Sequence, residues 1–355
     1  MDGGVGEAAR ARTAMTGPLP ATPAGPRQVA RRAAERALPP GTPRRDVARA
    51  AWQSVRELRA TTHRLRQVWT LPGLVEAGPP SYARWRRSHD ASRSELAQQR
   101  EQSRTAAQQP AVLVVVLAGG ADSGPALTAS LDSVRRQSWT HWRLAVALPS
   151  AAVEVEAGPD VAVHPAGPGG QAAAVGAAVA AAGTDFVVLL EAGDTLAPDC
   201  LYSVALASHR DPLVDLVVWD DDLVVEGRRT DPRFRPSWSP DLLTGADYVG
   251  RSFALRCSRF THAGGLRDGF GDAATWDLLL RADLPAERVA RVPRVLGHVA
   301  RRPDLAGPEG VRAVQEHLDR AGLAATAVAA GQGVRTSWSL DQQWPTVTVV
   351  IPTRH

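Results

Sequence analysis

Apolar and polar positions form alternating blocks along the middle of the chain. Continuous apolar runs predict buried strands at 111–117, 142–148, 161–164, 186–190 and 215–219. Between these runs, apolar residues at helical spacing predict helices at 126–137, 169–182 and 201–208. Strands that alternate with helices predict an α/β fold with a mostly parallel, doubly wound sheet and flanking helices.

The pattern is looser after residue 220, where a hairpin turn is expected at 226–229. Further helices are predicted at 272–281 and 309–321, and a strand at 289–299. We therefore assign 110–305 to the α/β domain and 306–344 to a linker of helix and strand. The apolar run near the end predicts that 345–355 is the first strand of a second, truncated domain of the same kind.

The first part of the chain divides in two by composition. Residues 1–45 are rich in Ala, Pro, Gly and Arg and carry few large apolar side chains, which predicts disorder. Residues 46–109 have helical spacing and an arginine-rich outer face, which predicts a helical N-terminal segment. That segment packs on the following domain in the simpler interpretation. In the alternative, its basic face contacts anionic lipid at the inner membrane surface.

Composition excludes several classes of function. The 355 residues contain no lysine, and the formal net charge is only +4. Acidic residues and arginines are mixed along the chain, which argues against a nucleic-acid partner. Cys200 and Cys257 have no metal-ligand spacing. Neither a signal peptide nor an apolar run of the ~20 residues that a membrane span needs is present, so we expect a cytoplasmic protein.

Two carboxylates follow the apolar run at 186–190. Glu191 and Asp194 are separated by an Ala-Gly turn, and Pro198 precedes the next helix. Open α/β sheets bind ligands at the carboxyl ends of their strands. Two carboxylates there can hold a divalent cation, which in turn can hold a diphosphate. The simpler interpretation is a polar turn that ends a core strand.

Seven separated segments of the chain follow one another in the order of a known family. They are 130–139, 189–198, 219–222, 231–243, 264–270, 276–281 and 292–298. The most specific is Asp231-Pro-Arg-Phe-Arg-Pro-Ser-Trp-Ser-Pro-Asp-Leu-Leu243. With these segments the chain resembles the family 2 inverting glycosyltransferases of GT-A fold. It is most similar to the long bacterial enzymes that carry two such domains and build cell-surface polysaccharide.

The resemblance implies transfer of a sugar from a nucleotide-diphosphate sugar to a polysaccharide or lipid-linked acceptor, with inversion. It implies Mn²⁺ or Mg²⁺ as cofactor, held by Glu191 and Asp194, because a cation neutralises the leaving diphosphate. The positions implied on the nucleotide-sugar and diphosphate side are Glu191, Asp194, Asp220, Asp222 and His298. The positions implied on the acceptor side are Trp238, Asp241 and Trp276.

The chain departs from the family at three acidic positions. Leu148 and Pro149 stand where the family has a pair of aspartates, and Gly193 replaces one acid of the metal-binding turn. At the catalytic base position the chain has Thr275, with Asp277 nearby. A threonine cannot take a proton at neutral pH, so the catalytic residue is unknown.

Two hypotheses remain for the domain. In the first, it is an active glycosyltransferase. In the second, it is a degenerate GT-A module that binds an acceptor or a partner and supports a downstream catalytic domain.

Overall fold

A computed structural model of the chain describes residues 82–119, 124–150, 158–303, 307–331, 333–339 and 346–351. The chain divides into two compact units, Met1–Pro79 and Pro80–His355, and every described residue belongs to the second. The predicted disordered segment 1–45 and the helical residues 46–81 lie outside the described residues. Residues 346–351 are exposed and carry no strand assignment, so the second domain predicted for 345–355 stays a prediction.

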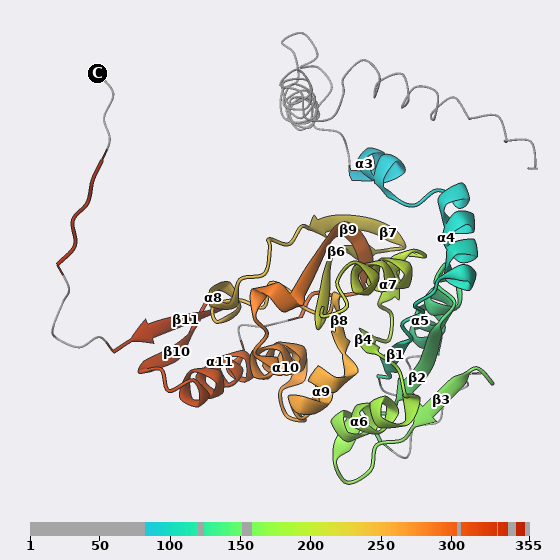
Figure 1. The fold of residues 1–355 in the computed structure, drawn as a ribbon. Helices are drawn as coiled ribbons and strands as arrows, with labels where there is room; N and C mark the ends of the chain where they lie inside the picture. The colour runs from blue at the N-terminus through green and yellow to red at the C-terminus, as the bar shows by residue number, and fades with distance from the viewer. Residues whose placement is uncertain are drawn as a thin grey trace, which may run out of the picture. The chain divides into compact units, whose positions relative to one another are not determined.

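A mixed sheet organises the second unit (Figure 1). In the described part of the chain its order is β3-β2-β1-β4-β8-β6-β9-β5, and β7 pairs with β6. The strands are β1 Val112–Leu117, β2 Trp142–Ala147, β3 Val161–His164, β4 Phe186–Glu191, β5 Thr195–Leu196, β6 Leu216–Val225, β7 Arg228–Arg233, β8 Phe253–Arg256 and β9 Val289–Val299.

Most of these strands run in one direction. β1, β2, β3, β4, β6 and β9 are oriented alike, whereas β5, β7 and β8 run antiparallel to their neighbours. In register, Leu117 pairs with Glu191 and Asp222 pairs with His298. The carboxyl ends of β1 and β4 therefore meet at one edge of the sheet, where ligands bind in open α/β folds.

Helices cover both faces of the sheet. On one face, α5 Gly124–Arg135 and α7 Cys200–Arg210 pack on the even-numbered apolar positions of β1. On the other face lie α6 Gly170–Ala182, α9 Cys257–His262, α10 Ala274–Ala282 and α11 Pro308–Arg320. Because β1 is buried on both faces, it reads as a continuous apolar run. The predicted α/β class, with a mostly parallel sheet and flanking helices, is confirmed.

The segment predicted as a linker, 306–344, contains α11 and an antiparallel hairpin. The hairpin strands are β10 Ala325–Ala330 and β11 Gly333–Trp338. Val314 and Leu318 of α11 are fully buried in the same core as Trp276 of α10. The backbone N–H of Val334 donates to the carbonyl of Gly245 at 2.8 Å. These described parts of the segment therefore belong to the α/β core.

Shorter elements complete the described part of the chain. They are α3 Tyr82–His89, α4 Arg93–Thr105, α8 Pro240–Leu243 and the 3₁₀ turns Gly271–Ala273 and Ala286–Arg288. A capping box between Ser92 and Glu95 begins α4. The predicted turn at 226–229 joins β6 to β7, and Glu226 and Gly227 both adopt the positive φ of a tight hairpin turn. Within the described ranges, no helix is both long and apolar enough to cross a bilayer.

Candidate functional site

The turn after β4 is held by α5, the helix that follows β1 in the chain. The hydroxyl of Ser130 in α5 donates to the carbonyl of Asp194 at 2.7 Å and accepts from the N–H of Gly193 at 2.9 Å. Gly193 has φ of 104°, a conformation that favours glycine. Gln137 donates to the carbonyl of Ala197 at 2.8 Å. The polar residues of the segment 130–139 thus shape this turn.

Both carboxylate oxygens of Asp194 are engaged by the protein. Asp194 is only 2% exposed. Its Oδ1 accepts from the backbone N–H of Ala300 at 2.9 Å, and its Oδ2 accepts from Nε of Arg251 at 2.9 Å. Arg251 is itself buried, and its side chain joins the two acids of the turn because it also lies 3.3 Å from Glu191.

Glu191 is shared between two arginines. Besides Arg251 it pairs with Arg301 at 3.0 Å, and Arg301 also binds Asp272 through a two-pronged contact. Burial raises the pKa of Glu191 above its ordinary value, although the two guanidinium groups act in the opposite direction.

The carboxylate oxygens at this turn do not fit the coordination of a divalent cation. Mg²⁺ and Mn²⁺ require carboxylate oxygens that face an open coordination position, whereas guanidinium and amide donors hold those of Asp194. Within the described part of the chain, no three His, Cys, Asp or Glu side chains are arranged to hold a metal ion. Glu191 and Asp194 are therefore brought together as predicted, but as partners of Arg251.

Asp220, Asp221 and Asp222 lie inside β6, not after it. The predicted end of this strand at residue 219 is wrong, because β6 continues to Val225 and pairs with β9 and β7. All three side chains are buried. Asp220 accepts from the N–H of Arg235 at 2.8 Å and pairs with Arg291 at 3.2 Å, and burial raises its pKa.

Asp221 pairs with two arginines. It accepts from Arg235 at 2.5 Å and from the hydroxyl of Ser252 at 2.7 Å, and it also pairs with Arg302. Burial alone would raise its pKa, but the charges and hydrogen bonds of Arg235 and Arg302 outweigh burial and hold the pKa below its usual range.

Asp222 and His298 contact each other across β6 and β9. Nδ1 of His298 lies 2.7 Å from Oδ1 of Asp222, while the hydroxyl of Tyr82 donates to Oδ2 at 2.5 Å. Arg229 donates to the same Oδ2 at 2.6 Å and binds Asp90 as well. Burial opposes ionisation of Asp222, but its hydrogen bonds hold its pKa below the ordinary value. The hydrogen bond from Tyr82 to Asp222 anchors α3 to the sheet.

The position expected for the catalytic base contains no free acid. Thr275 is buried at the start of α10. Asp277 is 1% exposed and pairs with Arg281 at 2.6 Å and with Arg267. Arg267 also reaches Glu316 of α11 at 2.7 Å. Asp277 therefore ties α10 to α11 and to the loop that carries Arg267.

Of the three residues expected on the acceptor side, two have structural contacts. Trp276 is fully buried and its indole N–H donates to the carbonyl of Leu243 at 2.8 Å, so it is a core residue and cannot contact an acceptor. The indole N–H of Trp238 donates to the carbonyl of Leu284 at 2.9 Å. Asp241 is exposed in the first turn of α8, which Ser239 caps.

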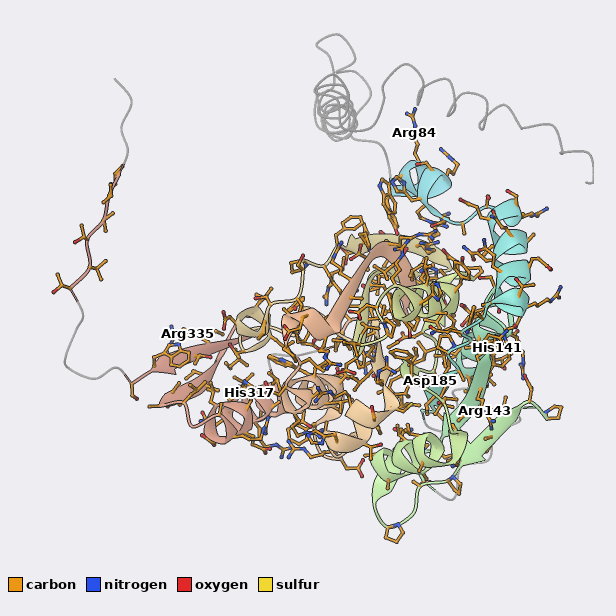
Figure 2. All side chains as sticks on the ribbon, in the orientation of Figure 1. Arg84, His141, Arg143, Asp185, His317 and Arg335 are labelled. Atoms are coloured by element: carbon orange, nitrogen blue, oxygen red, sulfur yellow. The ribbon has the colours of Figure 1, made fainter. Side chains whose placement is uncertain are left out.

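Acidic side chains also serve as structural acceptors at the opposite end of β4. Asp185, labelled in Figure 2, immediately precedes this strand. Its carboxylate accepts from the backbone N–H of Ala111 at 2.8 Å, just before β1. Both ends of the β1–β4 pair thus depend on carboxylates that the protein itself satisfies.

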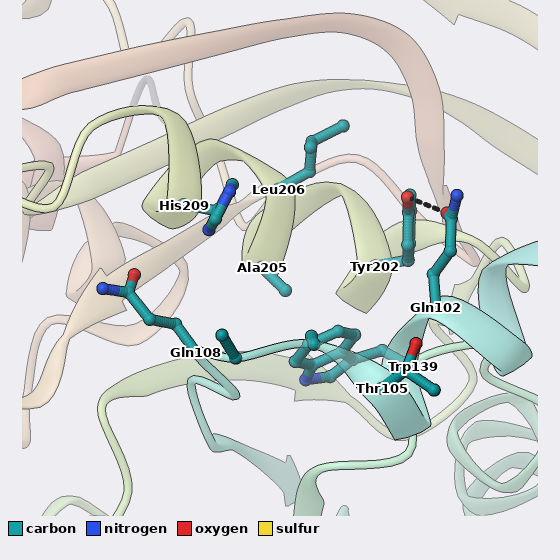
Figure 3. Close-up of a pocket in the computed structure, with 10 residues that line it drawn as sticks. Gln102, Thr105, Gln108, Trp139, Tyr202, Ala205, Leu206 and His209 are labelled. Carbon is teal, nitrogen blue, oxygen red and sulfur yellow. Dashed lines mark hydrogen bonds between the residues drawn. The ribbon is translucent and has the colours of Figure 1, made fainter. Parts of the chain in front are cut away.

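A separate apolar pocket lies between α4 and α7 (Figure 3). Its volume is about 260 Å³, and Trp139 and Leu206 are among its lining residues. The hydroxyl of Tyr202 donates to Gln102 at 2.6 Å on one side of it. No residue predicted for the site lines this pocket.

The arginines were not predicted as site residues. Arg251 pairs with Asp194 across 57 positions of sequence, and Arg302 pairs with Asp221 across 81. Nothing in a local motif marks such distant partners. The available signal was compositional, since a chain with many acids and no lysine depends mainly on arginine for its ion pairs.

No protein-family model matches the chain. It is 38% identical over 168 residues to the O-antigen biosynthesis protein RfbC of Myxococcus xanthus, covering 44% of the chain and 13% of that protein. It is 30% identical over 273 residues to the uncharacterized protein y4gI of Sinorhizobium fredii, covering 69% of the chain and 30% of that protein. The chain thus spans less than a third of the length of either relative.

Two solved structures show a weak likeness to the chain. The structure of S. aureus TarS 1–349 in complex with UDP has a TM-score of 0.45 at 14% identity, covering 59% of this chain and 65% of that one. The mannosyltransferase PcManGT of Pyrobaculum calidifontis, in complex with GDP-Man and Mn²⁺, has a TM-score of 0.42 at 17% identity. This match covers 63% of the present chain and 70% of the PcManGT chain. Because both scores are below 0.5, the description of the fold rests on the strand order of the chain itself.

Proposed function

We propose that the chain is a GT-A-type domain of a glycosyltransferase that builds cell-surface polysaccharide, and that this domain is itself non-catalytic. The whole protein would transfer a sugar from a nucleotide-diphosphate sugar to a polysaccharide or lipid-linked acceptor, with inversion, at the cytoplasmic face of the membrane. The naming of RfbC as an O-antigen biosynthesis protein and the order of the sequence motifs support the first part.

One observation carries the proposal that this domain is non-catalytic. Arg251 and the N–H of Ala300 occupy both oxygens of Asp194, the acid best placed to bind a metal. The absence of an acid at Leu148 and Thr275 agrees with it. In this proposal the domain supports a catalytic domain elsewhere in the protein and contributes binding of a glycan or a partner.

Titration of the chain with uridine diphosphate or deoxythymidine diphosphate, with and without Mn²⁺, tests the non-catalytic role. We expect Mn²⁺ to leave the affinity unchanged in the native chain and in Asp194→Asn alike. An active metal-dependent site would show binding at least about tenfold tighter with Mn²⁺. It would also lose that gain in Asp194→Asn, and this pair of results would refute the non-catalytic role by showing a working metal and nucleotide site.

A further inference from the structure

A second and larger cavity lies where the end of β7, the loop before β8 and the β10–β11 hairpin meet. Its volume is about 720 Å³, within the range of ~300–1,000 Å³ typical of small-molecule sites. The side chains that line it and can hydrogen bond belong to Asp231, Arg233, Asp247, Tyr248 and Arg302. Of these, none is among the residues that the sequence motifs suggested for the site.

Asp247 is a buried carboxylate with one oxygen unsatisfied. It is 3% exposed, and its Oδ1 accepts from the N–H of Gly250 at 2.7 Å. Its Oδ2 is buried and has no hydrogen-bond partner among the described residues. Burial raises the pKa of Asp247. A buried polar atom without a partner is costly, so this oxygen is suited to accept from a donor that a ligand supplies.

Arg233 supplies the complementary group in the same cavity. Its side chain is half-buried at the end of β7 and forms no hydrogen bond or close ion pair within the described residues, although the carboxylates of Asp221 and Asp247 act on its charge from nearby. Burial lowers its pKa, and the neighbouring guanidinium groups of Arg302 and Arg235 act in the same direction, whereas the carboxylates of Asp221 and Asp247 oppose them. A partly desolvated guanidinium that forms no direct ion pair is suited to bind a carboxylate or phosphate group.

Tyr248 adds an aromatic wall and a hydroxyl. The hydroxyl oxygen accepts from the N–H of Ser239 at 2.9 Å, which leaves its proton available to donate. A ligand with hydroxyl donors and acceptors and one negative charge therefore complements Asp247, Tyr248 and Arg233. Sugars that carry an acidic group have this combination.

We propose that this cavity binds an anionic saccharide, whose hydroxyl groups donate to Asp247 and whose carboxylate or phosphate pairs with Arg233. The proposal rests on the function proposed above and deepens it, because it gives the class of glycan that the domain binds. Arg228 is the matched control, since it lies on the same strand with an exposed side chain and does not line the cavity.

Calorimetric titration of the whole chain tests the site with four probes: a trimer of galacturonic acid, galactose 1-phosphate, the neutral trimer of galactose and inorganic phosphate. We expect one of the two acidic sugars to bind at least about tenfold more tightly than the neutral trimer and inorganic phosphate. Which acidic sugar binds distinguishes a carboxylate from a phosphate as the charged group. Arg233→Gln and Asp247→Asn should each weaken that binding about tenfold or more, and Arg228→Gln should not.

The proposal is overturned if neither acidic sugar binds, or if Arg233→Gln leaves the affinity unchanged. Inorganic phosphate that binds as tightly as the sugars would also overturn it, because the site would then recognise an anion alone. If Asp247→Asn does not fold, Arg233→Gln decides by itself. The nucleotide titration reports on a different site, so metal-dependent nucleotide binding would refute the non-catalytic role without affecting this result.

Discussion

Nε of Arg251 lies 2.9 Å from Oδ2 of Asp194, and both side chains are buried. Asp194 ends the turn after β4, where the carboxyl ends of parallel strands meet. The guanidinium group therefore satisfies the carboxylate at the position where a metal-dependent enzyme needs that carboxylate free. This ion pair gives the turn a structural role. Removing either partner should therefore lower the stability of the folded chain.

Asp194→Asn should lower the free energy of unfolding by about 3 kcal/mol, because it leaves the buried Arg251 without its main partner. Arg251→Met should have a similar cost. The double variant should be less destabilised than the sum of the two, with a coupling energy of about 2 kcal/mol. Denaturant unfolding measures all three, and the exposed Asp241→Ala is the control, expected to change stability by less than about 0.5 kcal/mol. Additive effects of the two single variants would contradict the pairing.

Asp221 should make stability depend on pH in the acid range. Its pKa in the folded protein is lowered, so its ion pairs contribute fully above the pKa of an unfolded aspartate, about 3.9, and are lost as the pH falls through the lower folded value. Asp221→Asn should cost about 3 kcal/mol at neutral pH. The difference from the native chain should shrink below about pH 4.

Unfolding of both proteins at pH 7 and at pH 3 measures this difference. Asp231→Asn serves as the control, because that side chain is 71% exposed and lies 3.7 Å from Arg302. It should unfold like the native chain at both values. A constant difference between Asp221→Asn and the native chain across the range would show that the carboxylate charge is not what stabilises β6.

Ser130→Ala should destabilise the domain by about 1–3 kcal/mol, since it removes the acceptor of the Gly193 N–H and the donor to the Asp194 carbonyl. Thr128→Ala on the same helix is the control. Its hydroxyl donates to the carbonyl of Gly124 at an exposed position, so we expect a change below about 0.5 kcal/mol. Equal thermal shifts for the two variants would refute the role given to Ser130.

Substitution by alanine should change the stability of the chain in opposite directions at two glycines. Gly193 has φ of 104°, and an added Cβ would lie 3.2 Å from that of Ala300, so Gly193→Ala should cost about 1–3 kcal/mol. Gly176 lies within α6, and nothing lies within 4 Å of an added Cβ. Gly176→Ala should stabilise the chain by up to about 1 kcal/mol. Thermal unfolding of both variants measures the contrast, and a stabilised Gly193→Ala would contradict the turn geometry.

Much of the fold was predictable because buried strands leave a strong local signal. The run at 289–299 became β9 with the same bounds, and the alternation of strands with helices gave the α/β class. The end of β6 was missed since Asp220, Asp221 and Asp222 are polar, and polarity usually ends a buried strand. They remain in the sheet because arginines and a histidine from distant segments satisfy each of them.

The position of the candidate site was predictable, but the side chains that contact its two acids were not. Glu191 and Asp194 lie at the expected edge of the sheet. Whether they could bind a cation depended on Arg251 and Arg301, which the chain brings in from 57 and 110 positions away. Arg233 and Asp247 were missed for the same reason, because a cavity formed by three separate segments has no local signature.

Direct measurement of Mn²⁺ binding by electron paramagnetic resonance tests the central claim that arginine occupies the acidic turn. With the native chain we expect the signal of free Mn²⁺ to persist at millimolar concentrations, and Asp194→Asn to give the same titration curve. A site that binds Mn²⁺ at micromolar concentration, and that is lost in Asp194→Asn, would contradict the claim and restore the turn to a metal-binding role.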